Sequence, residues 1–302
     1  MIAVDRKKRA LVIVTLMIIT ALYFWTQSRY PDLNRKAAMA AASSAIGDVS
    51  PWPIVEVKSD APFVEKWFYT TVNWAHANRK GMAFGITIAA MVLVLTSYFP
   101  LPRRARRLQN AAMGVAIGTP LGLCVNCAAP VFKSALRSGR VETAFALMLS
   151  SPTLNIVVLT MVFSLFPFYM AVVKVLTTLL CVFLAVPLIS RWLGDGHALR
   201  DVPKSDLQKL TDYVSTQTVT NITEPWHLAI PRTVWDVLRK LAILAVRLVP
   251  LMLFAGALGA IMALTIPTSS LAEYDGAAMV LLAAFIGVLL PVPVAFDVML
   301  VS

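Results

Sequence analysis

The chain has 302 residues, of which 58% are hydrophobic and only 14% are charged. Soluble domains carry about 25% charged residues, so this composition excludes an ordinary soluble protein and indicates an integral membrane protein. The net charge of +11 would suit a nucleic-acid partner, but the basic residues cluster beside apolar runs. This placement predicts that they orient helices in a lipid bilayer and that no nucleic acid binds. With three cysteines and three histidines, the sequence predicts no disulfide framework, no metal centre and no cofactor.

The first 81 residues predict a membrane anchor followed by an extracytoplasmic segment. DRKKR, residues 5–9, precedes an apolar run from Ala10 to Trp25 that ends in Tyr-Phe-Trp. Small residues at 37–42 lie too far beyond the run for a signal-peptide cleavage site, so we expect residues 1–30 to be a retained anchor. Residues 31–81 are polar and end in an aromatic stretch that predicts a short interfacial helix.

The remaining apolar runs predict the membrane-spanning helices. The uncharged stretch from 143 to 173 is too long for one crossing, which needs about 20 residues, and so predicts more than one span. Polar residues of mixed charge at 191–240 predict a loop. The expected spans and the last apolar segment are 82–99, 143–166, 168–190, 241–266 and 277–302.

The stretch TPLGLCVNCAAPVFKSALRSG, residues 119–139, is too broken for an ordinary membrane helix and too apolar for a solvated loop. Basic residues favour the cytoplasmic side, which places DRKKR and the RRARR at 103–107 there. If the stretch crossed the membrane, Arg137, Arg140 and the basic loop 191–240 would lie outside. A re-entrant segment keeps all of them cytoplasmic, and we predict that arrangement; a merely bent helix is the alternative.

Residues 82–136 and 241–302 share a pattern of a span, a connector and a proline-broken segment. The two broken segments would enter from opposite sides, as in the inverted repeats of many transporters. We therefore predict an all-α, polytopic transmembrane bundle with re-entrant helices and an inverted internal repeat, formed by 82–190 and 241–302. Because the chain ends inside an apolar segment, the pattern predicts that the natural protein continues with about two more helices.

Irregular backbone at membrane depth must line a protein-walled cavity, and this predicts a substrate site near the broken segment. Residues 150–155, SSPTLN, are a second polar break inside an apolar run, which predicts a substrate-facing notch; hydrogen bonding between helices is the alternative. The two thiols bind soft metals or metalloids or cycle as a disulfide; small buried hydrophobes are the alternative. Cys181 lies among leucine and valine, and we expect it to pack as a small apolar residue without a role in the substrate site. The candidate substrate-binding residues are Cys124, Asn126, Cys127, Pro130, Ser151, Pro152, Thr153 and Asn155.

Lys133 and Asp297 are ionisable residues in apolar surroundings, at matching places in the two predicted repeats. A charge inside the membrane is costly and by default indicates a transport pathway or relay, so we predict an ion relay at these two residues. The alternative is that both lie near the membrane edges and extend toward water.

The motifs TPLGLCVNCAAP, LRSGR and LSSPTLN together resemble the predicted-permease family that includes bacterial organoarsenical efflux permeases. The resemblance covers residues 82–190 well and 241–302 loosely, where Pro291 and Pro293 stand in place of cysteine. It implies a polytopic inner-membrane permease, and some relatives export trivalent methylated arsenicals. Cysteine involvement fits such a soft electrophile. The cytoplasmic N-terminus is expected from the basic residues DRKKR alone.

The sequence thus favours a permease, not an enzyme, that moves a small molecule or ion and exports a thiophilic compound. It carries no GxxxxGK[ST] stretch for nucleotide phosphates. The alternatives are a membrane thiol–disulfide enzyme that uses the CxxC, and a non-catalytic assembly protein whose 26–80 segment docks a partner. The sequence leaves open whether the chain forms a homo-oligomer.

Overall fold

Among the residues that the computed structural model describes, all regular structure is helical except for one two-residue strand pair, in which β1 (Ala3–Val4) pairs in parallel with β2 (Thr220–Asn221). This confirms the all-α expectation. The expected segment 277–302, with Pro291, Pro293 and Asp297, lies outside the described residues. The structure describes residues 3–31, 54–55, 60–98, 106–137, 141–155, 158–159, 162–163, 168–192, 220–221 and 225–265.

Within the described ranges, four helical stretches are long and apolar enough to cross a bilayer, which supports a multi-pass membrane protein. Two of them contain a π-helical turn, η1 (Trp25–Arg29) after α1 and η2 (Cys181–Ala185) between α8 and α9. The helices that form the four stretches are α1 (Arg6–Phe24), α3 (Phe63–Tyr98), α8 (Phe168–Leu180) with α9 (Val186–Trp192), and α12 (Trp226–Thr265).

Two helices are longer than the spans that were predicted from the apolar runs of the sequence. α3 has 36 residues, so the expected interfacial helix and the expected span from Met82 form one helix. α12 has 40 residues and begins inside the segment 191–240 that was expected to be a loop. At a rise of 1.5 Å per residue these helices are about 54 and 60 Å long, well beyond the roughly 30 Å hydrocarbon core. Their polar ends therefore continue the helix outside the apolar layer, where hydropathy gives no signal.

The expected span 143–166 is not one continuous helix. α6 (Val141–Thr153) ends at Thr153, and Leu154 and Asn155 form a bend. Pro152 cannot donate a backbone hydrogen bond to the carbonyl four residues earlier, and the Asn155 side chain bonds the main chain in place of the helix. The polar break inside this apolar run interrupts the helix.

The chain divides into two compact units, one made of Met1–Leu22 with Gly85–Ala245 and the other of Tyr23–Phe84 with Val246–Ser302. In the second unit, Trp67 Nε1 donates to the Ala257 carbonyl at 2.8 Å. The Trp74 ring occupies the space that a side chain at Gly256 would fill. Buried Asn73 accepts the backbone N–H of Ile54 at 3.0 Å. The two tryptophan contacts join the first half of α3 to the second half of α12 within that unit.

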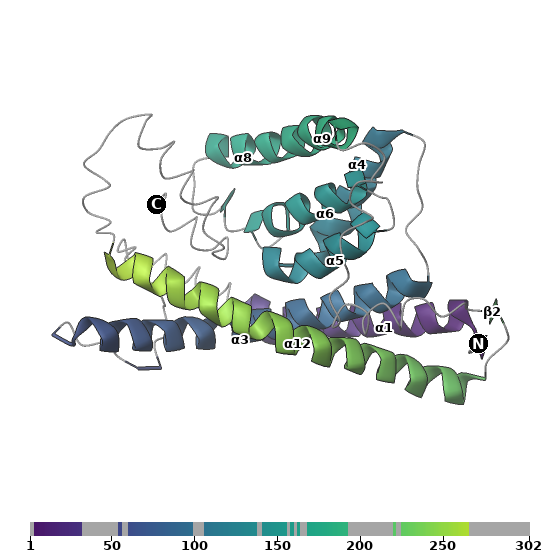
Figure 1. The fold of residues 1–302 in the computed structure, drawn as a ribbon, viewed down its shortest axis with the longest axis horizontal. Helices are drawn as coiled ribbons and strands as arrows, with labels where there is room; N and C mark the ends of the chain where they lie inside the picture. Colours follow the sequence, from purple (N-terminus) through teal and green to yellow (C-terminus); the bar gives the residue numbers. More distant parts are fainter. Residues whose placement is uncertain are drawn as a thin grey trace. The chain divides into compact units, whose positions relative to one another are not determined.

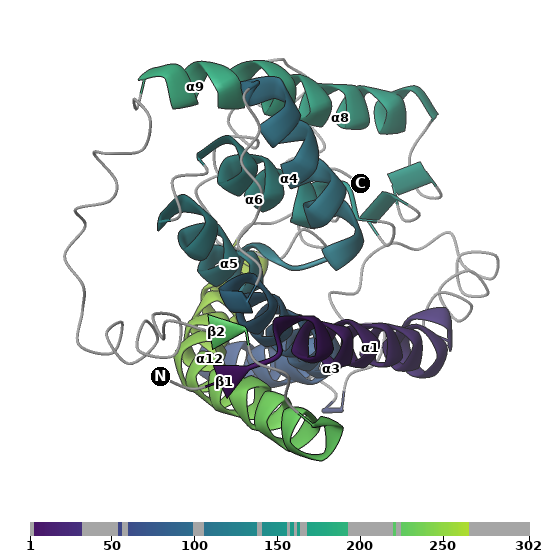
Figure 2. The same ribbon diagram turned by 90° about the vertical axis from the view of Figure 1, so that its right-hand side faces the viewer.

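The first unit contains the short helices α4 (Arg107–Leu121), α5 (Val125–Arg137) and α6, beside α8 and α9 (Figures 1 and 2). α4 packs most extensively against α6, and α5 also packs against α6. At the start of α4, Arg107 pairs with Glu142 at 3.8 Å and donates to Ser190 Oγ at 3.3 Å. These two contacts tie α4 to α6 and to α9.

Two glycines allow α4 and α6 to touch along their backbones. A Cβ atom at Gly114 would lie 2.6 Å from the Ala146 Cβ, and one at Gly118 would overlap Ser150 Oγ and lie 2.9 Å from the Leu147 carbonyl oxygen. Small residues spaced by four are a common means of close helix packing in membranes, where no hydrophobic force drives helices together.

We predict that Gly118→Ala separates α4 from α6. The added methyl group has no space, and overpacking of this kind lowers the free energy of unfolding by about 1–3 kcal/mol. Ala116→Val, which adds bulk on an exposed position of the same helix, is the control. The measurement is the thermal unfolding midpoint of both variants in detergent. Equal midpoints would contradict this packing.

Candidate substrate-binding site

The chain breaks between α4 and α5 at Gly122. This residue follows the last residue of α4 and has φ +58° and ψ +31°, a left-handed conformation that glycine adopts at least cost. Three residues later, Val125 begins α5. Each short helix has one proline, Pro120 in α4 and Pro130 in α5. The predicted break in the stretch 119–139 is therefore present, as two helices joined by a tight turn.

The two cysteines of the CxxC lie at the beginning of α5. The Cys124 carbonyl accepts the Ala128 N–H at 2.8 Å, and the Cys124 sulfur accepts the Cys127 N–H at 3.4 Å, so Cys124 caps the helix. Cys124 is half-buried and Cys127 is fully buried. The positive end of the helix dipole favours negative charge on sulfur at this position.

Ser151 and Asn155 form a polar notch at the end of α6, and both are buried. The Asn155 amide nitrogen donates to the carbonyls of Ser151 and Pro152, both at 3.1 Å, and its side-chain oxygen accepts the Val158 N–H at 2.9 Å. Asn155 thus replaces the main-chain bonds that the helix loses beyond Pro152. The Asn155 side chain thereby stabilises the bend that ends α6.

One hydrogen bond joins the two breaks. The backbone N–H of Leu123, whose side chain is fully buried, donates to Ser151 Oγ at 2.9 Å. A Cβ at the adjacent Gly122 would lie 3.7 Å from the Asn155 Cβ. The structure therefore brings the turn before Cys124 together with the notch of α6, although the two are well separated along the chain.

The prolines leave carbonyl groups without their usual helical donors near this site. Pro130 lacks the N–H that would bond the Asn126 carbonyl, and Pro152 lacks the N–H that would bond the Met148 carbonyl. The Thr119 hydroxyl, one residue before Pro120, is buried and has no hydrogen-bond partner among the described residues. Broken helices in transporters present free groups of this kind to their substrates.

Gly85 of α3 lies directly over the buried thiol. A Cβ at Gly85 would be 2.9 Å from Cys127 Sγ and 3.5 Å from Cys127 Cβ. No larger residue fits there unless the thiol moves. α3 therefore forms the cover of the deeper cysteine.

The other predicted residues take separate positions. Asn126 is half-buried, and the Thr153 hydroxyl bonds the Leu149 carbonyl of its own helix. Lys133 is exposed on α5, while its expected partner Asp297 lies outside the described residues. Cys181 is exposed in η2, so the expectation of plain packing there is wrong. Within the described part of the chain, no three metal-binding side chains gather into a cluster.

Sequence reasoning missed the glycine positions and one polar cluster. Gly114, Gly118 and Gly122 are spaced by four in GVAIGTPLG, a pattern that the sequence does contain and that predicts a packing stripe. The contact of Gly85 with Cys127 has no local signal, because it joins residues of separate helices. Likewise, nothing in the sequence pairs Arg9 with Asp236, which are 227 positions apart.

The chain belongs to the predicted-permease family, whose model matches residues 75–302. The match includes α4, α5, α6 and both breaks, and it begins after α1. No curated protein and no solved structure matches the chain.

We predict that Ser151→Ala destabilises the turn before Cys124. The substitution leaves the buried Leu123 N–H without an acceptor, which costs about 1–3 kcal/mol. Ser97→Ala is the control, because Ser97 Oγ bonds only the Val94 carbonyl of its own helix. Amide hydrogen exchange of the peptide that contains Leu123 should be faster in Ser151→Ala. Unchanged exchange would show that the bond does not hold the turn.

Proposed function

We propose that this predicted permease carries a small thiophilic solute, such as a trivalent organoarsenical, out of the cell across the bacterial inner membrane. The observation that carries the proposal is the CxxC pair at the beginning of α5, where the Cys127 N–H donates to the Cys124 sulfur directly after the break at Gly122. Family membership and four apolar helices support a membrane permease, and the thiol pair supports the class of solute.

The chemistry of the pair suits a trivalent arsenical. A compound R–As(OH)₂ can exchange both hydroxyl groups for two cysteine sulfurs, with release of two water molecules that take up the thiol protons. Half-buried Cys124 would react first and buried Cys127 second. The step is reversible and involves no change in oxidation state, so the solute can be released on the other side. Soft ligands such as thiolates favour soft acceptors of this kind.

The short helices support a re-entrant arrangement. α4 has 15 residues and α5 has 13, so they are about 22 and 20 Å long, each less than the roughly 30 Å of the hydrocarbon core. A segment that enters, turns at Gly122 and returns would leave Cys124 inside the membrane. Three further features are proposed together with the re-entrant arrangement. They are a cytoplasmic N-terminus, an inverted repeat formed by 82–190 and 241–302, and an ion relay formed by Lys133 and Asp297.

A membrane thiol–disulfide enzyme is the second candidate. The more accessible cysteine caps a helix and the second is buried behind it, an order that suits attack by the first thiol and resolution by the second. This function requires a redox partner, and the family match favours the permease.

We predict that Cys124→Ser and Cys127→Ser each abolish resistance to methylarsenite in cells that lack other arsenic efflux systems. One remaining sulfur holds the arsenical far more weakly than two. The readout is growth against methylarsenite together with the arsenic content of the cells. Cys181→Ser, which changes an exposed cysteine on η2, should keep wild-type resistance.

Two outcomes decide between the candidates. If the wild-type protein confers no resistance, but the pair cycles between thiol and disulfide in membranes, the enzyme replaces the permease. If both site variants export methylarsenite as fast as the wild type, the cysteines are not the substrate site.

We predict that a cysteine introduced at Arg140 reacts only from the cytoplasmic side. A re-entrant segment returns the chain to the side of residues 103–107, whereas a full crossing delivers it to the periplasm. The measurement is labelling by a membrane-impermeant maleimide in intact cells and in inside-out vesicles, in the Cys181→Ser background. Labelling in intact cells would refute the re-entrant arrangement.

A further inference from the structure

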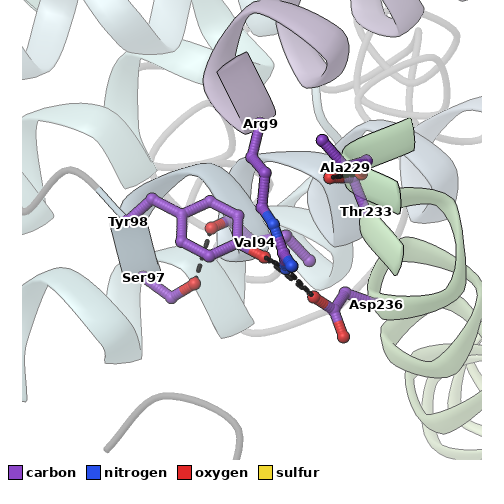
Figure 3. Close-up of polar contacts among 7 residues, drawn as sticks. All are labelled: Arg9, Val94, Ser97, Tyr98, Ala229, Thr233 and Asp236. Carbon is purple, nitrogen blue, oxygen red and sulfur yellow. Dashed lines mark hydrogen bonds and ion pairs between the residues drawn. The ribbon is translucent and has the colours of Figure 1, made fainter. Parts of the chain in front are cut away.

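Three helices of the first unit meet at a buried polar cluster made of Arg9 of α1, Tyr98 of α3 and Asp236 of α12 (Figure 3). The Arg9 guanidinium donates to the Asp236 carboxylate at 3.3 Å and to the Tyr98 hydroxyl at 3.2 Å. The Tyr98 hydroxyl donates to the same carboxylate oxygen at 2.8 Å. Arg9 is only 3% exposed. Each member therefore bonds both of the others.

α1 is held at this end by further contacts of its first turn. The Lys8 ammonium lies 5.6 Å from the centre of the Trp226 ring of α12. Asp5 accepts the Lys8 N–H at 3.2 Å and caps the helix, and this bond lowers the pKa of Asp5. β1, just before α1, pairs with β2, just before α12. The beginning of α1 is thus fixed to the beginning of α12.

The burial of Arg9 makes the cluster sensitive to the loss of a partner. A buried guanidinium is tolerated when its charge is paired, and removal of a charged partner from such a pair is strongly destabilising. Loss of the Asp236 carboxylate removes the ion pair that holds the first turn of α1 against α12. Tyr98 is hydrogen-bonded to both Arg9 and Asp236. If these two residues separate, the last residue of α3 therefore loses the hydrogen bonds that hold it.

α3 connects this cluster to the thiol pair. Tyr98 is its last residue, and Gly85, which covers the Cys127 sulfur, lies 13 residues earlier, about 20 Å along the same helix. Most residues of α3 between the two positions are buried, with Ile88, Ala89 and Ala90 between 0% and 3% exposed. A closely packed helix moves as a rigid body, so a shift at Tyr98 is transmitted to Gly85.

We propose that Arg9, Tyr98 and Asp236 form a latch through which α1 controls access to Cys127. With the latch closed, α3 is held in place and Gly85 covers the thiol. When the latch opens, α3 moves and Cys127 becomes accessible. The inference rests on the proposed function only because it takes the thiol pair as the substrate site. The three latch residues do not touch the substrate; they act by positioning α3.

The test is the rate at which N-ethylmaleimide alkylates each cysteine of the full-length protein in native membranes, followed by mass spectrometry of the peptides. In Arg9→Gln and in Asp236→Asn, Cys127 should react about tenfold faster than in the wild type, because the reaction of a buried thiol follows local opening. Exposed Cys181 is the internal reference and should react at an unchanged rate.

Two further variants separate the latch from a general loss of charge. Lys7→Gln removes an exposed positive charge two residues before Arg9 and should leave the Cys127 rate unchanged. The charge exchange Arg9→Asp with Asp236→Arg restores the ion pair and should return Cys127 to slow reaction. If Arg9→Gln does not accumulate in the membrane, Arg9→Lys and Tyr98→Phe replace it, and an increase of about threefold is expected because each retains part of the cluster.

The latch is refuted if Cys127 reacts within about twofold of the wild-type rate in these variants, or if Cys181 becomes faster in parallel, which would indicate general loosening. The alkylation rates do not depend on any transported solute. Failure of methylarsenite export with the expected alkylation pattern would therefore reject the proposed function and leave the latch standing.

Discussion

The hydrogen bond from the Leu123 N–H to Ser151 Oγ is the contact on which the candidate site depends. A buried backbone N–H without an acceptor costs about 1–3 kcal/mol. At the turn before Cys124, a hydroxyl from another helix accepts this N–H. The same serine belongs to α6, whose lost main-chain bonds beyond Pro152 are replaced by Asn155. The two breaks are therefore joined to one another.

This bond also requires α4 and α6 to lie unusually close together. Gly114 and Gly118 provide that approach, since a Cβ at either position would collide with α6. Gly122 then continues the same spacing into the turn, where its left-handed backbone ends the helix. Helix packing and the geometry of the break thus follow from one series of glycines. The position of the thiol pair is a consequence of this packing, because Cys124 follows the turn directly.

The sequence predicted where the helices break but not the contacts that stabilise the breaks. Proline, glycine and paired cysteines inside an apolar run mark a broken helix, and Ser151 with Asn155 marked the second break. Helix bounds were predicted less well, because the polar ends of α3 and α12 carry no hydropathy signal. The partners of Arg9 and of Leu123 lie far away along the chain, and pairings of that kind are set by tertiary packing alone.

Burial of Arg9 explains why α1 is more than an anchor. An anchor needs only an apolar surface toward lipid, and exposed Leu11, Ile18 and Leu22 supply one. A buried guanidinium adds nothing to anchoring, and an apolar residue of similar size would pack there without a desolvation cost. What an ion pair adds is a contact that holds in one geometry and is lost when the partners separate. Such a contact holds Tyr98, the last residue of α3, beside α1 and α12, on the same helix as Gly85, which lies against the Cys127 thiol.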